Sequence, residues 1–187
     1  KHIIAICFTV LTSQAYAQDD LLNMMDSAPS KPEPVKATFK TTRVLNGHSI
    51  EQVASRHLDF RINHRFGLLN SGYDQFYGLD YARIRLSLEY GINDWAMIGI
   101  GRNNLGRKAW DYFAKFRVLR QTKDNSIPLS VSLLGTAAVD ITKIANSTSL
   151  TDRTTYTSQI LLARKFTEGI SIQLTPTYIH RNQVETP

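Results

Sequence analysis

Apolar and polar side chains alternate along the stretch HLDFRINHRFG, residues 57–67. One register is mostly apolar and holds Leu58, Phe60, Ile62, His64 and Phe66. The other register is polar and mostly charged, and it holds His57, Asp59, Arg61, Asn63 and Arg65. Successive side chains of a β-strand point to opposite faces, so the stretch predicts a strand with one apolar and one charged face.

The same period of two recurs along the rest of the chain. We expect strands over 56–66, 81–90, 95–102, 109–120, 129–139, 155–166 and 170–181, and we find no convincing amphipathic helix. The connections over 67–80 and 140–154 are long, those over 91–94 and 167–169 are tight, and those over 103–108 and 121–128 are intermediate. This order predicts an all-β, antiparallel up-and-down barrel of about seven strands, with short turns at one end and longer loops at the other.

Two features favour a transmembrane barrel over a soluble β-sandwich, which also alternates but buries its apolar face. The predicted strands have about ten residues, which suits a tilted crossing of a thin bilayer, whereas strands of soluble domains centre on about five or six. Aromatic residues gather at strand ends, as in the interfacial girdles of membrane barrels. These are Tyr81, Tyr90, Trp95, Trp110, Tyr112 and Phe166. The secreted sandwich stays open as the alternative fold.

The N-terminus has the pattern of a secretory signal peptide. Residues 1–17, KHIIAICFTVLTSQAYA, combine a basic start, a short apolar run and the small residues Ala15 and Ala17. We expect cleavage after Ala17, which also removes Cys7, the only cysteine, so disulfides and cysteine chemistry are excluded from the mature chain. Residues 18–36 hold three prolines and alternating charges, which predicts a flexible periplasmic linker.

The segment between the linker and the first long strand is ambiguous. Residues 37–54 read ATFKTTRVLNGHSIEQVA. A short strand over 37–42 is compatible with the alternation, and Asn46-Gly47 is a turn signal. His48 is a candidate metal ligand or base, but a turn or plug residue near the barrel entrance is the better interpretation.

The chain is basic, with 22 Lys and Arg against 16 Asp and Glu. An exported protein seldom meets nucleic acid, so we expect no such partner and assign the positive charge to lipopolysaccharide, small anions or the protein's own carboxylates. We also expect contacts with outer-membrane lipid and the barrel assembly machinery.

Five stretches form a specific combined pattern: ATFKTTRVLNGHSIE (37–51), LDFRINHRFG (58–67), GLDYARIRLSLEYGINDWAMIGIGR (78–102), FAKFRVLRQ (113–121) and LLARKFTEGISIQLTPTYIHRN (161–182). They resemble a family of bacterial β-barrel proteins classed as a domain of unknown function. The resemblance covers nearly all of the chain after the linker and implies an outer-membrane barrel of Gram-negative cells, without assigned substrate or catalytic residues. Members of that family continue beyond Pro187, and bacterial barrels usually have an even strand number. We therefore expect 37–187 to be a C-terminally truncated barrel domain that lacks roughly one to five strands.

The charged register of the predicted strands would face the barrel interior. Its candidates are Asp59, Arg61, Arg65, Arg83, Arg85, Glu89, Asp111, Lys115, Arg117 and Lys165. Opposite charges are expected to pair as Asp59 with Arg61, Arg85 with Glu89, and Asp111 with Lys115. Basic groups outnumber acidic ones, which is compatible with a small, weakly anion-preferring pore. A salt-bridged closed lumen, in a structural or partner-binding envelope barrel, is the alternative.

Two repeated pairs, His64-Arg65 and His180-Arg181, fall at the ends of strands that run outward. His64, His180 and Arg181 are candidates for contacts with lipid head groups, although snorkelling interfacial residues have the same pattern. We expect no enzyme, cofactor or metal, because the chain has no H-E-x-x-H, G-x-S-x-G or P-loop motif. Ser87 and Ser132 are the nearest candidates for a hydrolase nucleophile, and no spacing supports either.

Overall fold

The computed structural model describes residues 32–81, 83–104, 108–142 and 149–182. The chain divides into a unit over 1–33 and a second unit over 34–187, and the description below concerns the second. The predicted signal peptide and the linker as far as residue 31 lie outside the described residues.

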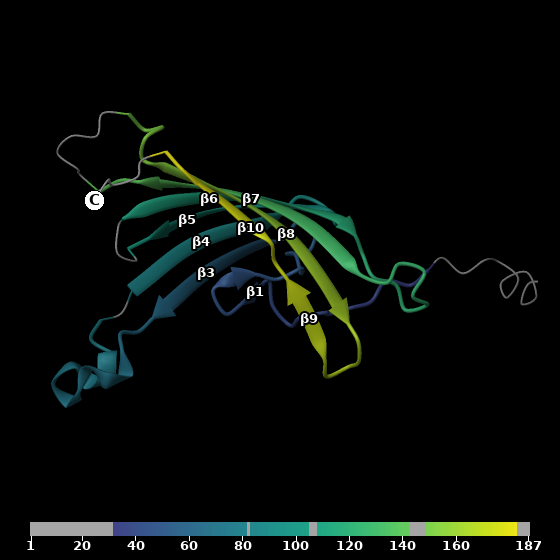
Figure 1. Cartoon of the computed structure of the whole chain (residues 1–187), viewed down its shortest axis with the longest axis horizontal. Helices are drawn as coiled ribbons and strands as arrows, with labels where there is room; N and C mark the ends of the chain where they lie inside the picture. The colour runs from purple at the N-terminus through teal and green to yellow at the C-terminus, as the bar shows by residue number, and fades with distance from the viewer. Residues whose placement is uncertain (1–31, 82, 105–107, 143–148, 183–187) are drawn as a thin grey trace, which may run out of the picture. The chain divides into compact units, whose positions relative to one another are not determined.

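One antiparallel sheet of eight strands makes up most of the second unit (Figure 1). Its strands are β3 (Leu58–Arg65), β4 (Arg83–Gly91), β5 (Ala96–Asn103), β6 (Ala109–Leu119), β7 (Ser130–Asp140), β8 (Thr154–Lys165), β9 (Ser171–Leu174) and β10 (Thr177–Arg181). The strands from β3 to β8 pair with their neighbours in chain order, as an up-and-down topology requires. Among the described residues the sheet does not close, because β3 forms one edge and β9 and β10 form the other. The predicted all-β, antiparallel fold is confirmed as an incomplete barrel.

Two local irregularities were missed by the alternation. The predicted strand over 170–181 is divided into β9 and β10, although both pair with β8 in one register, Leu162 with Leu174 and Gln159 with Thr177. The break falls at Pro176, which has no N–H to give to the ladder. In β6 a register shift between Arg117 and Leu119 ends the expected alternation.

The apolar register lies on the outer face of the sheet and is exposed. Cross-strand partners form one row over seven strands: Phe60, Leu88, Ile100, Tyr112, Ala137, Tyr156 and His180. Phe60 is 60% exposed and Leu88 is 43% exposed. A soluble sandwich would cover such a face with a second sheet, and the described part of the chain contains no sheet that does so.

The inner face of the sheet is covered by residues 37–54, which we call the inner segment (Figure 1). Its two short strands, β1 (Arg43–Val44) and β2 (Gly47–His48), form a hairpin. Ile50 of this segment packs with Met97, Phe113, Leu134 and Leu161 of the sheet in a small apolar core. No strand forms over 37–42, where the alternation left a short strand possible, since 38–42 are bends. The predicted turn exists, but Leu45 and Asn46 occupy it and Gly47 begins β2.

Backbone hydrogen bonds hold the inner segment at the end of the sheet that carries the turns 92–95, 120–129 and 166–170. Val35 N donates to Gln121 O over 2.8 Å where the chain enters, and Arg56 N donates to Gly91 O over 2.6 Å where it leaves. A Cβ atom on Gly91 would lie 2.2 Å from the Ala54 carbonyl oxygen. Glycine at this position therefore allows the inner segment to lie directly against β4.

The opposite end of the sheet carries the long connection between β3 and β4. It contains two 3-10 helices, η1 (Leu69–Ser71) and η2 (Tyr73–Gly78), and Gly67 N donates to Gly78 O over 2.7 Å at its base. Leu68, Leu69 and Tyr73 are exposed there. No helix among the described residues is both long enough and apolar enough to cross a membrane.

Candidate functional site: the inner face of the sheet

The polar register of β4, β6 and β7 is buried beneath the inner segment. Glu89, Lys115 and Ser132 are fully buried, and Ser87 is 3% exposed. A charge that loses its water needs a partner, because transfer of an unpaired charge into a protein interior costs several kcal/mol. The inner segment supplies partners for both charges.

Arg43 of β1 is the partner of Glu89. Its Nη2 donates to Glu89 Oε1 over 2.5 Å, and its Nη1 lies 2.5 Å from His48 Nδ1 across the hairpin. The Arg43 guanidinium also lies 5.1 Å from the centre of the Phe113 ring, and the His48 ring meets that ring edge-on at 4.5 Å. Burial lowers the pKa of Arg43 to about 10, against the opposing effect of Glu89. The guanidinium therefore stays charged at neutral pH.

Burial also lowers the pKa of His48 far below its usual value, and the neighbouring charge of Arg43 lowers it further. The imidazole is therefore neutral at pH 7, which allows one ring nitrogen to accept a hydrogen bond from Arg43. The sequence favours a turn or plug residue over a metal ligand at His48. In the structure His48 belongs to the hairpin and its ring contacts Phe113 on the inner face of the sheet. Among the described residues no group of three His, Cys, Asp or Glu side chains is arranged to hold a metal ion.

Lys115 of β6 holds the second half of the inner segment. Its Nζ donates to the backbone carbonyl of Ser49 over 3.1 Å and also to that of Glu51. Gln173 of β9 adds a two-sided contact, since its Nε2 donates to His48 O and its Oε1 accepts from Ile50 N, each over 2.8 Å. Sequence reasoning missed Gln173, because a single polar residue in a strand carries no signal of a backbone partner 123 residues away.

Arg85 and Asp111 form an ion pair that spans a strand. Arg85 of β4 donates through Nε and Nη2 to both carboxylate oxygens of Asp111 on β6, at 2.5–3.0 Å. Between them lies β5, where Gly101 occupies the inner face. A Cβ atom on Gly101 would lie 2.5 Å from Arg85 Nη2 and 2.6 Å from Asp111 Oδ1. The glycine leaves the room in which this bidentate pair forms.

The structure therefore corrects two of the three expected charge pairs. Asp59 and Arg61 do pair, with 2.5 Å between Oδ2 and Nη2. Arg85 pairs with Asp111 instead of Glu89, and Lys115 binds backbone carbonyls instead of Asp111. The expected pairs were chosen within single strands, whereas the observed contacts of these four side chains cross strands or reach the inner segment.

The remaining interior candidates lie toward the two ends of the sheet. Arg117 donates to the carbonyl of Asp94 over 2.9 Å in the β4–β5 turn. Lys165 pairs with Glu168 over 2.8 Å in the β8–β9 turn. Arg65 and Arg83 lie directly opposite each other at the other end, in the last cross-strand pair of β3 and β4.

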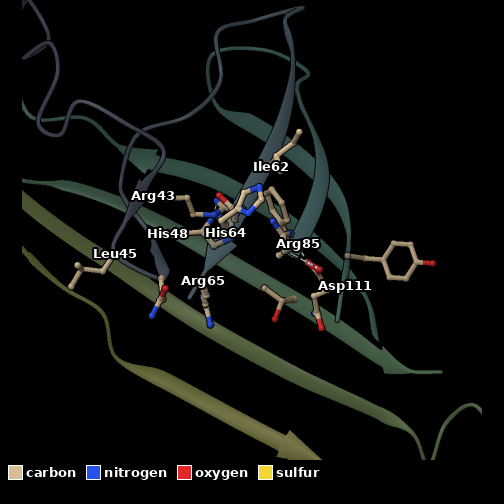
Figure 2. A pocket seen from close by; sticks show the side chains of 14 residues that line it. Arg43, Leu45, His48, Ile62, His64, Arg65, Arg85 and Asp111 are labelled. Atoms are coloured by element: carbon tan, nitrogen blue, oxygen red, sulfur yellow. Dashed lines mark hydrogen bonds and ion pairs between the residues drawn. The ribbon is translucent and has the colours of Figure 1, made fainter. Parts of the chain in front are cut away.

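A cavity of about 480 Å³ opens at the tip of the β1–β2 hairpin, on the side of the long loops (Figure 2). Its wall includes the guanidinium groups of Arg43, Arg65 and Arg85, together with one carboxylate, Asp111. Asn63 and Thr136 add neutral polar groups. The cavity is therefore polar and predominantly basic, and it lies beyond the point at which the inner segment fills the interior.

The candidates for lipid contact lie near the same end. His64 and His180 both occupy the outward register, although His64 also forms part of the cavity wall (Figure 2). The His64 ring is stacked with Phe66 at 6.4 Å between centroids. Arg181 ends β10 opposite Thr155. All three are exposed.

Neither serine candidate has a catalytic arrangement in the described structure. The Oγ atoms of Ser87 and Ser132 are buried beneath the inner segment without a hydrogen-bond partner. A serine nucleophile needs a base within hydrogen-bond reach.

Comparison with known proteins adds one finding. Residues 39–187 match the model of a family described as Membrane bound beta barrel domain (DUF5777). The chain belongs to this family. The family places the protein in a membrane, which explains why an apolar row is exposed on the outer face of its sheet. No curated protein and no solved structure gives a significant match to the chain.

Proposed function

We propose that this membrane-bound barrel resides in the outer membrane and is closed by its own inner segment, with a structural or partner-binding role in the envelope. One observation carries the proposal. The fully buried Lys115 donates its ammonium hydrogens to two carbonyls of the inner segment, and Arg43 neutralises Glu89 from the same segment. The two buried charges of the sheet, Glu89 and Lys115, therefore both have partners in the inner segment.

The signal-peptide pattern and the girdle-like aromatic residues support the outer membrane as the location. With the linker in the periplasm, β3 runs outward, and the long β3–β4 loop lies outside the cell. Its exposed Leu68, Leu69 and Tyr73 would then be available to a partner in the envelope. Lipid, lipopolysaccharide and the barrel assembly machinery are the other proposed contacts.

A small, weakly anion-preferring pore is the second candidate. The observation in its favour is the basic cavity beyond the inner segment, where Arg43, Arg65 and Arg85 face a single Asp111. Such a pore would conduct only after the inner segment had moved, because Lys115 holds that segment across the interior.

Conductance across planar bilayers separates these candidates. We expect no steady current through the full-length protein. The variant Lys115→Met loses both donated hydrogen bonds and loosens the inner segment. Lys108→Met is the control, because Lys108 is exposed and directly precedes the same strand. Brief openings in the Lys115 variant alone would support a gated pore, and their anion preference follows from the reversal potential in a salt gradient. A steady current through the wild-type protein would contradict the proposal that the inner segment blocks the barrel interior.

A further inference from the structure

Arg65, which forms part of the cavity wall, belongs to a pair of like charges across two neighbouring strands. Arg65 and Arg83 are direct cross-strand partners, and both belong to the inward register of their strands. Opposed residues in an antiparallel pair have Cβ atoms about 4.5–5.5 Å apart, and like charges there are destabilising. Within the described ranges, no carboxylate pairs with either guanidinium.

The other charged side chains nearby already have partners. Arg85 forms a bidentate ion pair with Asp111, and Arg43 forms an ion pair with Glu89. Arg61, which precedes Arg65 by four residues on the same face of β3, is paired with Asp59. The carboxylates of Asp59, Glu89 and Asp111 are thus paired, whereas no ion pair with a carboxylate of the described residues is found for Arg65 or Arg83.

The surroundings of this pair offer further hydrogen-bond donors and room for a ligand. Arg65 forms part of the wall of the 480 Å³ cavity, as do the amide-bearing Asn63 and Asn103 (Figure 2). Asn63 precedes Arg65 by two residues on the same face, and Asn103 is the cross-strand partner of Arg85. Guanidinium forks and amide N–H groups together suit a compact oxyanion.

We propose that a phosphate group binds at the edge of this cavity where Arg65 lies, held between the guanidinium groups of Arg65 and of its cross-strand partner Arg83 and assisted by Asn63 and Asn103. The bound oxyanion would remove the repulsion between the two arginines. Binding here does not require the barrel to conduct, because the cavity lies beyond the inner segment. The phosphate could belong to a free solute or to the head group of a lipid, and both present the same oxygens.

Calorimetric titration of the full-length protein with inorganic phosphate tests the site. The protein is held in dodecyl maltoside micelles, which carry no phosphate, and sodium chloride at equal ionic strength provides the baseline. We expect saturable binding that weakens at least tenfold in Arg65→Gln and in Arg83→Gln. The matched control is Arg61→Gln, because Arg61 lies on the same strand and face but is already paired with Asp59.

The source of the phosphate follows from a second arm, in which lipopolysaccharide is added to the micelles. Competition by lipopolysaccharide supports the site and assigns it to a head group, whereas undiminished phosphate binding supports the site and assigns it to a free solute. No saturable phosphate binding in the micelles would overturn the proposal. Equal affinities of the wild-type protein and the Arg65 and Arg83 variants would overturn it as well. Neither result depends on the conductance of the barrel.

Discussion

On the inner face, side chains of two strands can form an ion pair across the strand that lies between them. Arg85 on β4 reaches Asp111 on β6, and the backbone between them carries no side chain at Gly101. A bidentate ion pair has a fixed geometry. It therefore depends on the open space over Gly101, on the inner face of β5. The smallest possible change at that position, the addition of one methyl group, is therefore informative.

We predict that Gly101→Ala destabilises the barrel by about 1–3 kcal/mol, the usual cost of overpacking a fitted interior. The new Cβ atom would lie 2.5 Å from Arg85 Nη2, so the ion pair must shift or break. The control is Gly135→Ala on β7, where a Cβ atom would meet nothing within 4 Å. The midpoint of thermal unfolding in detergent measures both, and equal midpoints of the two variants would refute the role assigned to Gly101.

The residue scale is also where the sequence was least informative. Alternation correctly separated the inward register from the outward one, and so placed Glu89, Asp111 and Lys115 inside. It gave no information on the register between neighbouring strands, and that register brings Arg85 within reach of Asp111 across Gly101. The partners of Lys115 could not be predicted for another reason, because they are backbone carbonyls of a segment without a clear period.

At the scale of elements, the β1–β2 hairpin has a built-in sensitivity to pH. His48 lies among the cationic groups Arg43, Lys115, Arg85 and Arg61, and its other neighbour is the Phe113 ring. Protonation of the imidazole would place a further positive charge in that cluster. Burial and these cations hold the pKa of His48 well below 6.5, its value in an undocked segment.

Docking of the hairpin should therefore weaken as the pH falls. Above pH 6.5 the imidazole is neutral in both states and its titration costs nothing. Below pH 6.5 the undocked segment binds a proton that the docked one does not, and each unit costs about 1.4 kcal/mol until the lowered pKa is reached. We predict faster hydrogen exchange of residues 43–48 at pH 5 than at pH 7.5, after correction for intrinsic rates.

The variant His48→Gln is the control for this effect, because it keeps a polar side chain but has no proton to gain in this range. We expect the ratio of corrected exchange rates at the two pH values to approach one in this variant. A wild-type hairpin that exchanges equally at both pH values would show that His48 does not control docking.

At the scale of the whole molecule, most of the fold followed from the sequence. Strand positions, antiparallel order and the exposed apolar face all derive from a period of two that extends across 56–181. The inner segment did not follow, since ATFKTTRVLNGHSIEQVA has no sustained period and contributes only four residues to strands. Its position is determined by partners on β4, β6 and β9, which are distant in the sequence. The break at Pro176 was not predicted from the alternation, although proline has no N–H to donate to a ladder.

Two exposed leucines offer a direct test of which surface meets lipid. Leu88 lies in the outer row between Phe60 and Ile100 and is 43% exposed, whereas Leu45 lies at the hairpin tip beside the polar cavity and is 97% exposed. In water, arginine would be tolerated at either exposed position. In a bilayer, an arginine on the lipid-facing surface costs about 2–4 kcal/mol near the midplane, and less toward the interfaces. We therefore predict that Leu88→Arg lowers the fraction of folded, heat-modifiable protein in the membrane and that Leu45→Arg does not. Equal recovery of both variants would mean that the outer row does not face lipid.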